Sequence, residues 1–160
     1  AWKVLLEKLW KWHTRRPTEI HALVDAEDRE ASFPTIIFTS SAGVSANITY
    51  HTSMLLLFSH QPCAISPVDW HSMTGADEAQ MSPLWHARRV CGIALNSDPE
   101  HTKCWDPCLI AAFTLAAQQM THPAQQTDLL ACLDRVRAAG WHIDGLVRKL
   151  REHWGRSIND

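Results

Sequence analysis

The sequence has no basic run, no long hydrophobic run and only one tyrosine. Fifteen Lys and Arg residues against seventeen Asp and Glu residues give a formal net charge of −2. Without a basic patch, the chain lacks the electrostatic footprint of a nucleic-acid-binding surface. Apolar runs such as residues 54–58 are far shorter than the roughly 20 residues needed to cross a bilayer. We therefore expect neither direct nucleic-acid contact nor a membrane span.

Cysteine is present in an odd number and in no framework spacing. The five cysteines are spread over apolar segments, at Cys63, Cys91, Cys104, Cys108 and Cys132. This pattern favours reduced thiols in an intracellular protein, cytoplasmic or, if the chain belongs to a regulator, nuclear. A Gly-rich phosphate loop, a dinucleotide fingerprint and a nucleophilic triad are also missing from the sequence, so we expect no cofactor.

Helical periodicity, in contrast, runs through most of the chain. Its length fits a single domain over 1–160. Apolar spacing and cap signals predict helices over about 2–13, 18–26, 43–59, 84–96, 108–120, 124–139 and 143–154. Residues 33–38 (FPTIIF) have strand character but no partner strand, so we interpret them as an apolar connector. The sequence therefore predicts an all-α fold, a compact bundle of six or seven helices with one long loop at about 60–82.

The stretch HTKCWDPCLIAAF (101–113) permits two interpretations. His101, Cys104 and Cys108 supply three potential zinc ligands, but their spacing is loose and no second ligand pair follows. In the other interpretation Asp106 caps a helix that begins at Pro107, and Cys108 packs in the first turn as a small hydrophobe. We favour this helix entrance and predict no metal site.

His51 is the strongest candidate for chemistry, because it lies on the apolar stripe of its helix between Ile48 and Leu55. Histidine can donate, accept or carry a proton near neutral pH. The alternative is a buried histidine that is satisfied by a hydrogen bond to a neighbouring group. We keep His51 as the candidate catalytic residue.

Other polar or aromatic groups near apolar faces are candidate ligand contacts. Arg88 and Arg89 can meet a carboxylate or carbonyl, although such a pair is often one solvated residue and one ion-paired residue. Trp70 and His71, in the long loop, can form a lid or an anchor. The predicted ligand-binding residues are Tyr50, Met54, Trp85, Arg88, Arg89, Trp105, Gln118 and Gln119.

Four segments resemble the carboxy-terminal helical regulatory domain of fungal zinc binuclear cluster transcription factors. They are FPTIIFTSSAG, TYHTSMLLL, HARRVCGIAL and the long run from Cys104 to Gly155, in that order along the chain. The resemblance implies a helical domain that senses effectors or restrains an activator. The cluster of six cysteines with which that family reads DNA is not in this sequence.

Together these features predict a transcription-factor-like helical domain that binds an apolar secondary metabolite. Because the sequence gives no support for redox or phosphoryl chemistry, catalysis would consist of holding a substrate conformer in an apolar cavity, with one or two hydrogen-bond donors to polarise it. A cofactor-free cyclisation of the Diels–Alder type needs little more than that. The alternative is a regulatory module, without catalytic activity, that binds an effector or a protein. A homodimer is also possible, through the apolar amino-terminal helix.

Overall fold

The computed structural model describes residues 1–28, 30–61, 78–97 and 105–157. The α-helices of this part are α1 (Trp2–Arg15), α2 (Ser41–Ser59), α4 (Pro83–Leu95), α5 (Pro107–Ala117), α6 (Pro123–Ala138) and α7 (Asp144–Ser157). Two short 3₁₀ helices, Thr18–Ile20 and Glu78–Met81, and two three-residue strands, β1 (Val24–Ala26) and β2 (Thr35–Ile37), complete the described elements. The prediction of an all-α bundle with six or seven helices is confirmed.

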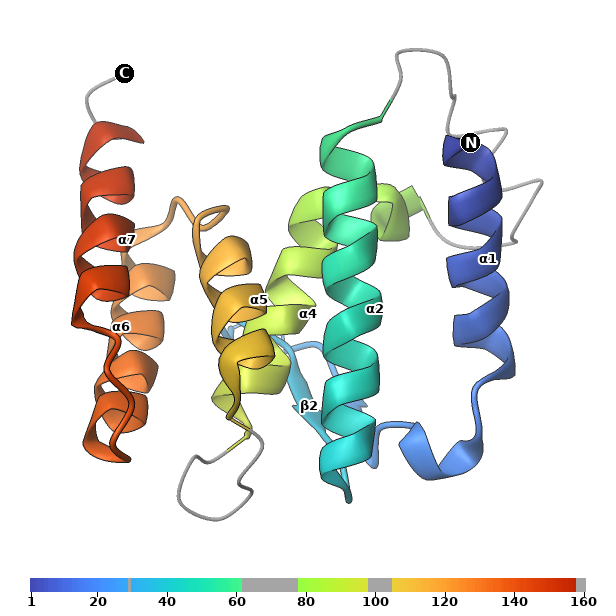
Figure 1. Ribbon diagram of the computed structural model, residues 1–160, viewed down its shortest axis with the longest axis horizontal. Helices are drawn as coiled ribbons and strands as arrows, with labels where there is room; N and C mark the ends of the chain where they lie inside the picture. The colour runs from blue at the N-terminus through green and yellow to red at the C-terminus, as the bar shows by residue number, and fades with distance from the viewer. Residues whose placement is uncertain (29, 62–77, 98–104, 158–160) are drawn as a thin grey trace.

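The helices lie side by side in a row that runs along the long axis of the molecule. Helix α1 is at one end of the row, and α6 and α7 are at the other (Figure 1). The main hydrophobic core lies between α2, α4, α5, α6 and α7, and Phe113 of α5 is completely buried in it. A second, smaller core joins α1 to α2 through Leu6, Tyr50, Met54 and Phe58. The two cores meet at α2, which therefore has buried residues on most of its circumference.

Polar side chains and prolines set the starts of the middle helices. Ser40, Ser82 and Asp106 each accept a hydrogen bond from a backbone N–H in the first turn of the helix that follows. His122 does the same for α6, through its Nδ1 atom. Because α4, α5 and α6 all begin with a proline, the first helical φ angle is already fixed at each start. The predicted cap at Asp106 is confirmed.

The prediction of a helix over residues 18–26, and of an unpaired connector over residues 33–38, was wrong. Only Thr18–Ile20 is helical, and Val24–Ala26 pairs antiparallel with Thr35–Ile37 to form a small sheet. The missing partner strand was hidden because Leu23 and Val24 fit a helical stripe as well as a strand. The hydrogen bond from Leu23 N to Ile37 O, 2.8 Å long, extends the pairing by one residue.

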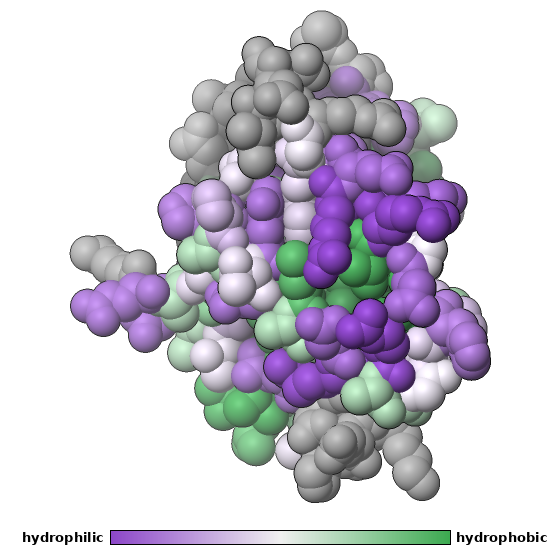
Figure 2. All heavy atoms as spheres, turned by 90° about the vertical axis from the view of Figure 1, so that its left-hand side faces the viewer, coloured by the Kyte–Doolittle hydropathy of each residue, from purple (hydrophilic) through white to green (hydrophobic). Residues whose placement is uncertain are grey.

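Figure 2 shows the face formed by α6 and α7, where hydrophilic side chains surround a small apolar area. Arg137 forms ion pairs on this side with Asp134 and Asp144. At the opposite end of the molecule, α1 leaves Val4, Leu5 and Trp12 exposed. The homodimer stays a prediction. No helix in the described ranges is long and apolar enough to cross a membrane.

Candidate functional site

The predicted catalytic residue, His51, lies in a buried cluster where α2 faces α4. Its side chain is 2 % exposed, and that of His86 on α4 is 1 % exposed. The Nδ1 atoms of the two rings are 2.9 Å apart, within hydrogen-bond distance. Because buried polar atoms need partners, the two imidazoles satisfy each other in the helix interface.

The hydrogen bonds at the outer ends of this pair fix the position of every ring proton. Arg89 Nε donates to His51 Nε2 over 3.4 Å, and a guanidinium can only donate. His51 must therefore carry its proton on Nδ1 and donate it to His86 Nδ1. His86 then carries its proton on Nε2, 3.0 Å from the Gln80 carbonyl oxygen, which can only accept. The result is a directional chain from Arg89 through His51 and His86 to Gln80.

Electrostatics favour the neutral form of both rings. Burial lowers the pKa of His51 well below its usual value, and the positive charge of Arg89 lowers it further. Burial likewise lowers the pKa of His86 to about 3, against a smaller raising effect of its hydrogen bond to Gln80. An added proton would also place two N–H groups face to face in the chain. The pair is therefore uncharged at neutral pH.

Arg89 connects the pair to the small sheet. Its guanidinium forms an ion pair with the Asp25 carboxylate on β1. It also lies over the Trp85 ring, 4.8 Å from the ring centroid, in a cation–π contact. One arginine of the Arg88–Arg89 pair is thus ion-paired, as one of the two interpretations held. The Nε atom of Arg88 is buried without a hydrogen-bond partner.

Helix α1 covers the other side of the pair with His13. The His13 ring is stacked on Tyr50 at 4.2 Å between centroids, and it lies 6.2 Å from the His51 ring. Burial lowers the pKa of His13 to about 3 and raises that of the Tyr50 hydroxyl. Both groups are thus uncharged at neutral pH, as the apolar surroundings require.

These contacts bear directly on what His51 can do. Both ring nitrogens of His51 are hydrogen-bonded inside the protein, so neither is free to take a proton from a substrate. A substrate would have to displace Arg89 or separate α2 from α4. The geometry is that of a structural pair, and the catalytic role of His51 stays a prediction.

The structure brings some of the predicted ligand-binding residues together and separates the others. Tyr50, Trp85 and Arg89 surround His51, whereas Met54 is fully buried in the second core. Trp105 packs on Phe113 and donates from Nε1 to the Ser97 carbonyl at 2.8 Å, so it anchors its segment. Gln118 and Gln119 form the turn after α5, where Gln119 is exposed.

Several predicted positions lie outside the described residues. They are His101 and Cys104 of the zinc interpretation, and Trp70 and His71 of the proposed lid. Cys108, the third zinc candidate, is an exposed free thiol in the first turn of α5. In the part of the chain that the structure describes, no three or more His, Cys, Asp and Glu side chains are grouped so that they could hold a metal ion.

Sequence reasoning missed an apolar groove of about 430 Å³ between α2 and α5. Helix α2 lines it with Ile48, Thr49, Thr52, Ser53 and Leu56, and α5 lines it with Cys108, Ala111, Ala112 and Leu115. On α5 these positions follow the spacing i, i+3, i+4 and i+7 of one helix face, and on α2 the positions from Thr49 to Leu56 show the same spacing. That shared stripe of small side chains was the signal in the sequence.

Thr52 is the unusual residue of this groove. Its hydroxyl oxygen is buried and has no hydrogen-bond partner. In contrast, Thr49 and Thr114 each donate to the carbonyl oxygen four residues earlier, at 2.8 Å and 2.7 Å. A buried hydroxyl without a partner costs about 1–3 kcal/mol. A rotation about the Cα–Cβ bond can exchange the positions of the Thr52 methyl and hydroxyl groups. The hydroxyl would then face the groove, where it can form one hydrogen bond with a bound molecule.

We expect Thr52→Val to stabilise the free protein by about 1 kcal/mol, because it removes the unpaired hydroxyl at almost constant shape. For a protein of this size, that corresponds to an increase in Tm of about 2–4 °C. Thr49→Val is the matched control, since the Thr49 hydroxyl is satisfied and its loss brings no such gain. Thermal denaturation followed by circular dichroism measures both variants. An unchanged or lower Tm for Thr52→Val would contradict the unpaired hydroxyl.

Comparison with models of known protein families, with curated proteins and with solved structures found no match for this chain. The resemblance to the fungal regulators therefore stays a prediction.

Proposed function

We propose that this chain is an effector-binding domain, of the regulatory type that its sequence resembles, and that the groove between α2 and α5 holds an apolar small molecule. The observation that carries the proposal is the groove itself. Its volume of about 430 Å³ falls within the range of roughly 300–1,000 Å³ that is typical of small-molecule sites. Its lining is mostly aliphatic, with a few small polar groups that can orient a ligand.

The exposure of the groove supports a ligand that enters from solvent. Leu56 is 44 % exposed, although a leucine on a helix that packs on several neighbours is usually covered. Ala111 and Cys108 on the opposite wall are exposed as well. An apolar molecule seated there would cover this surface and gain about 25 cal/mol for each Å² of apolar area removed from water.

Binding is tested first with the apolar fluorescent probe 1-anilinonaphthalene-8-sulfonate. We expect one probe molecule to bind the native protein, and Ala111→Phe to weaken binding at least tenfold because the ring fills the groove. Ala138→Phe adds the same ring at an exposed position on α6 and should leave binding unchanged. Equal probe binding by the wild-type protein and both variants would refute the groove as the site.

The natural ligand is sought by native mass spectrometry of the protein purified from a fungal host. Any small molecule that travels with the wild-type protein and not with Ala111→Phe is then extracted and identified. Incubation of that molecule with fresh protein tests the predicted cyclisation, which would give a product of unchanged mass. Recovery of the unchanged molecule after incubation would support effector binding alone. If neither protein carries a molecule, a groove ligand is not supported.

A further inference from the structure

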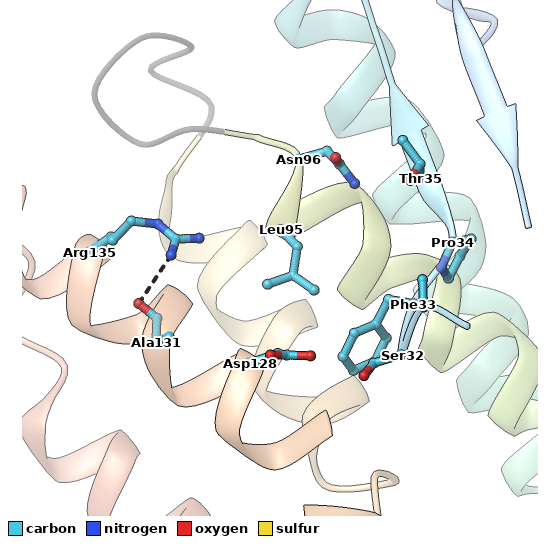
Figure 3. Close-up of a pocket in the computed structure, with 10 residues that line it drawn as sticks. Ser32, Phe33, Pro34, Thr35, Leu95, Asn96, Asp128, Ala131 and Arg135 are labelled. Atoms are coloured by element: carbon cyan, nitrogen blue, oxygen red, sulfur yellow. Dashed lines mark hydrogen bonds between the residues drawn. The ribbon is translucent and has the colours of Figure 1, made fainter. Parts of the chain in front are cut away.

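A second pocket lies between the segment that leads into β2, the end of α4 and α6 (Figure 3). Its volume is about 330 Å³. Phe33, Pro34 and Leu95 provide an apolar surface inside it, and Asn96, Asp128 and Arg135 provide polar groups. This lining differs from that of the groove between α2 and α5, because it combines an apolar floor with two full charges.

The walls of the pocket are held by contacts from three elements. Gln125 Nε2 on α6 donates to the Ser32 carbonyl at 3.2 Å, which ties α6 to the segment before β2. Pro34 packs so closely on Gly92 of α4 that its carbonyl oxygen would be 2.4 Å from an added Cβ atom. Asn96 Nδ2 donates to the Gly92 carbonyl at 2.7 Å. The pocket is therefore preformed, so ligand binding would carry only a small conformational-entropy cost for ordering its walls.

In the part of the chain that the structure describes, neither charged residue of the pocket, Asp128 or Arg135, forms an ion pair. Arg135 donates weakly to the Ala131 carbonyl at 3.5 Å and also forms a side-chain hydrogen bond with Cys132. They are seven residues apart on α6, or about 10 Å along the helix axis. In Figure 3 they project from α6 at different levels, while Leu95 and Phe33 point into the space beside them. A positive and a negative group thus flank an apolar surface.

We propose that this pocket binds a small amphoteric molecule, with a flat apolar body between an amine and a carboxylate. Arg135 would receive the carboxylate, because a guanidinium matches two carboxylate oxygens in a bidentate hydrogen bond. Asp128 would receive the ammonium group, and Phe33, Pro34 and Leu95 would contact the body of the molecule. This inference does not depend on the apolar groove, since the two sites have no lining residue in common.

The proposal is tested with 4-(aminomethyl)benzoate, which carries an amine and a carboxylate at opposite ends of one ring. Binding is followed by two-dimensional NMR of the isotope-labelled chain, with benzoate and benzylamine as single-charge controls. We expect the zwitterion to bind about tenfold more tightly than either control, because each control lacks one charged hydrogen bond. The shifted resonances should lie in residues 32–35, 95–96 and 128–135.

Two charge-removing variants complete the test. Arg135→Gln should bring the zwitterion to the affinity of benzylamine, and Asp128→Asn should bring it to that of benzoate. Arg148→Gln removes a charge from the exposed surface of α7 and should change nothing. Weak binding with equal affinity for all three compounds, shifts outside the pocket, or equal affinities of the three variants would each overturn the proposal.

Discussion

Acidification from pH 7 to pH 5 is expected to lower the free energy of unfolding by about 4 kcal/mol through the His51–His86 pair alone. Both rings are neutral in the folded protein, where their pKa values are lowered. In the unfolded chain they take up protons once the pH falls below about 6.5. The unfolded state then binds more protons than the folded state, so the stability that is present above pH 6.5 is lost as the pH falls.

A series of variants separates the pair from the other titrating groups. His51→Leu removes one of the two linked protonations. Between pH 7 and pH 5 this variant should therefore keep about half of the free energy of unfolding that the wild type loses through the pair. The double variant His51→Leu/His86→Leu removes both and should lose about 4 kcal/mol less than the wild type between pH 7 and pH 5. His142→Gln, at an exposed position, serves as a control. Urea unfolding followed by tryptophan fluorescence gives the free energy of unfolding of each protein at both pH values. If the wild type and the double variant lose equal amounts of it, the histidine pair is not the cause of the acid sensitivity.

Gly92→Ala is expected to destabilise the protein by at least about 2 kcal/mol, although alanine favours a helix by up to about 1 kcal/mol over glycine. The added Cβ atom would lie 2.4 Å from the Pro34 carbonyl oxygen, which belongs to the backbone and cannot rotate away. Either α4 or the segment before β2 must move. Because Pro34 lines the pocket in Figure 3 and would have to move, the variant should also weaken binding of 4-(aminomethyl)benzoate.

Gly145→Ala is the matched control for Gly92→Ala. Gly145 is also in a helix, and an added Cβ atom there meets no atom within 4 Å. We expect this variant to be slightly more stable than the wild type, by up to about 1 kcal/mol, through helix propensity alone. Equilibrium urea unfolding gives the free energy of unfolding of both variants. The difference between them separates the steric cost of the contact with Pro34 from the helix propensity of alanine. Similar free energies of unfolding for the two variants would show that the segment at Pro34 moves at little cost in free energy, which would contradict this prediction.

Features that depend on neighbouring residues were predictable from the sequence. The starts of α4, α5 and α6 follow from Ser82, Asp106 and His122, each next to a proline, because a cap acts within one helical turn. The burial of His51 followed from its place on an apolar stripe, and it is confirmed. Such local signals fixed most of the helices and one member of the histidine pair.

Features that depend on contacts between distant segments were not predictable. His86 is 35 residues from His51, and nothing in the pattern of α4 indicates which turn faces α2. The strand Val24–Ala26 is too short to show alternation, so its pairing with Thr35–Ile37 appears only in the fold. The groove likewise depends on how far α2 and α5 diverge, which the stripe of small residues does not determine.

The direction of the hydrogen-bond chain has a consequence for how the sequence can change over evolution. A residue that replaces His51 must accept from Arg89 and donate to His86 at the same time. A single apolar replacement takes a hydrogen-bond partner from both neighbours of the lost imidazole, one of which is the other buried histidine, whereas exchanging both histidines for apolar residues leaves no imidazole without its partner. In related chains, positions 51 and 86 are therefore expected to vary together, polar with polar and apolar with apolar, and the arginine at 89 to be lost only when both have become apolar.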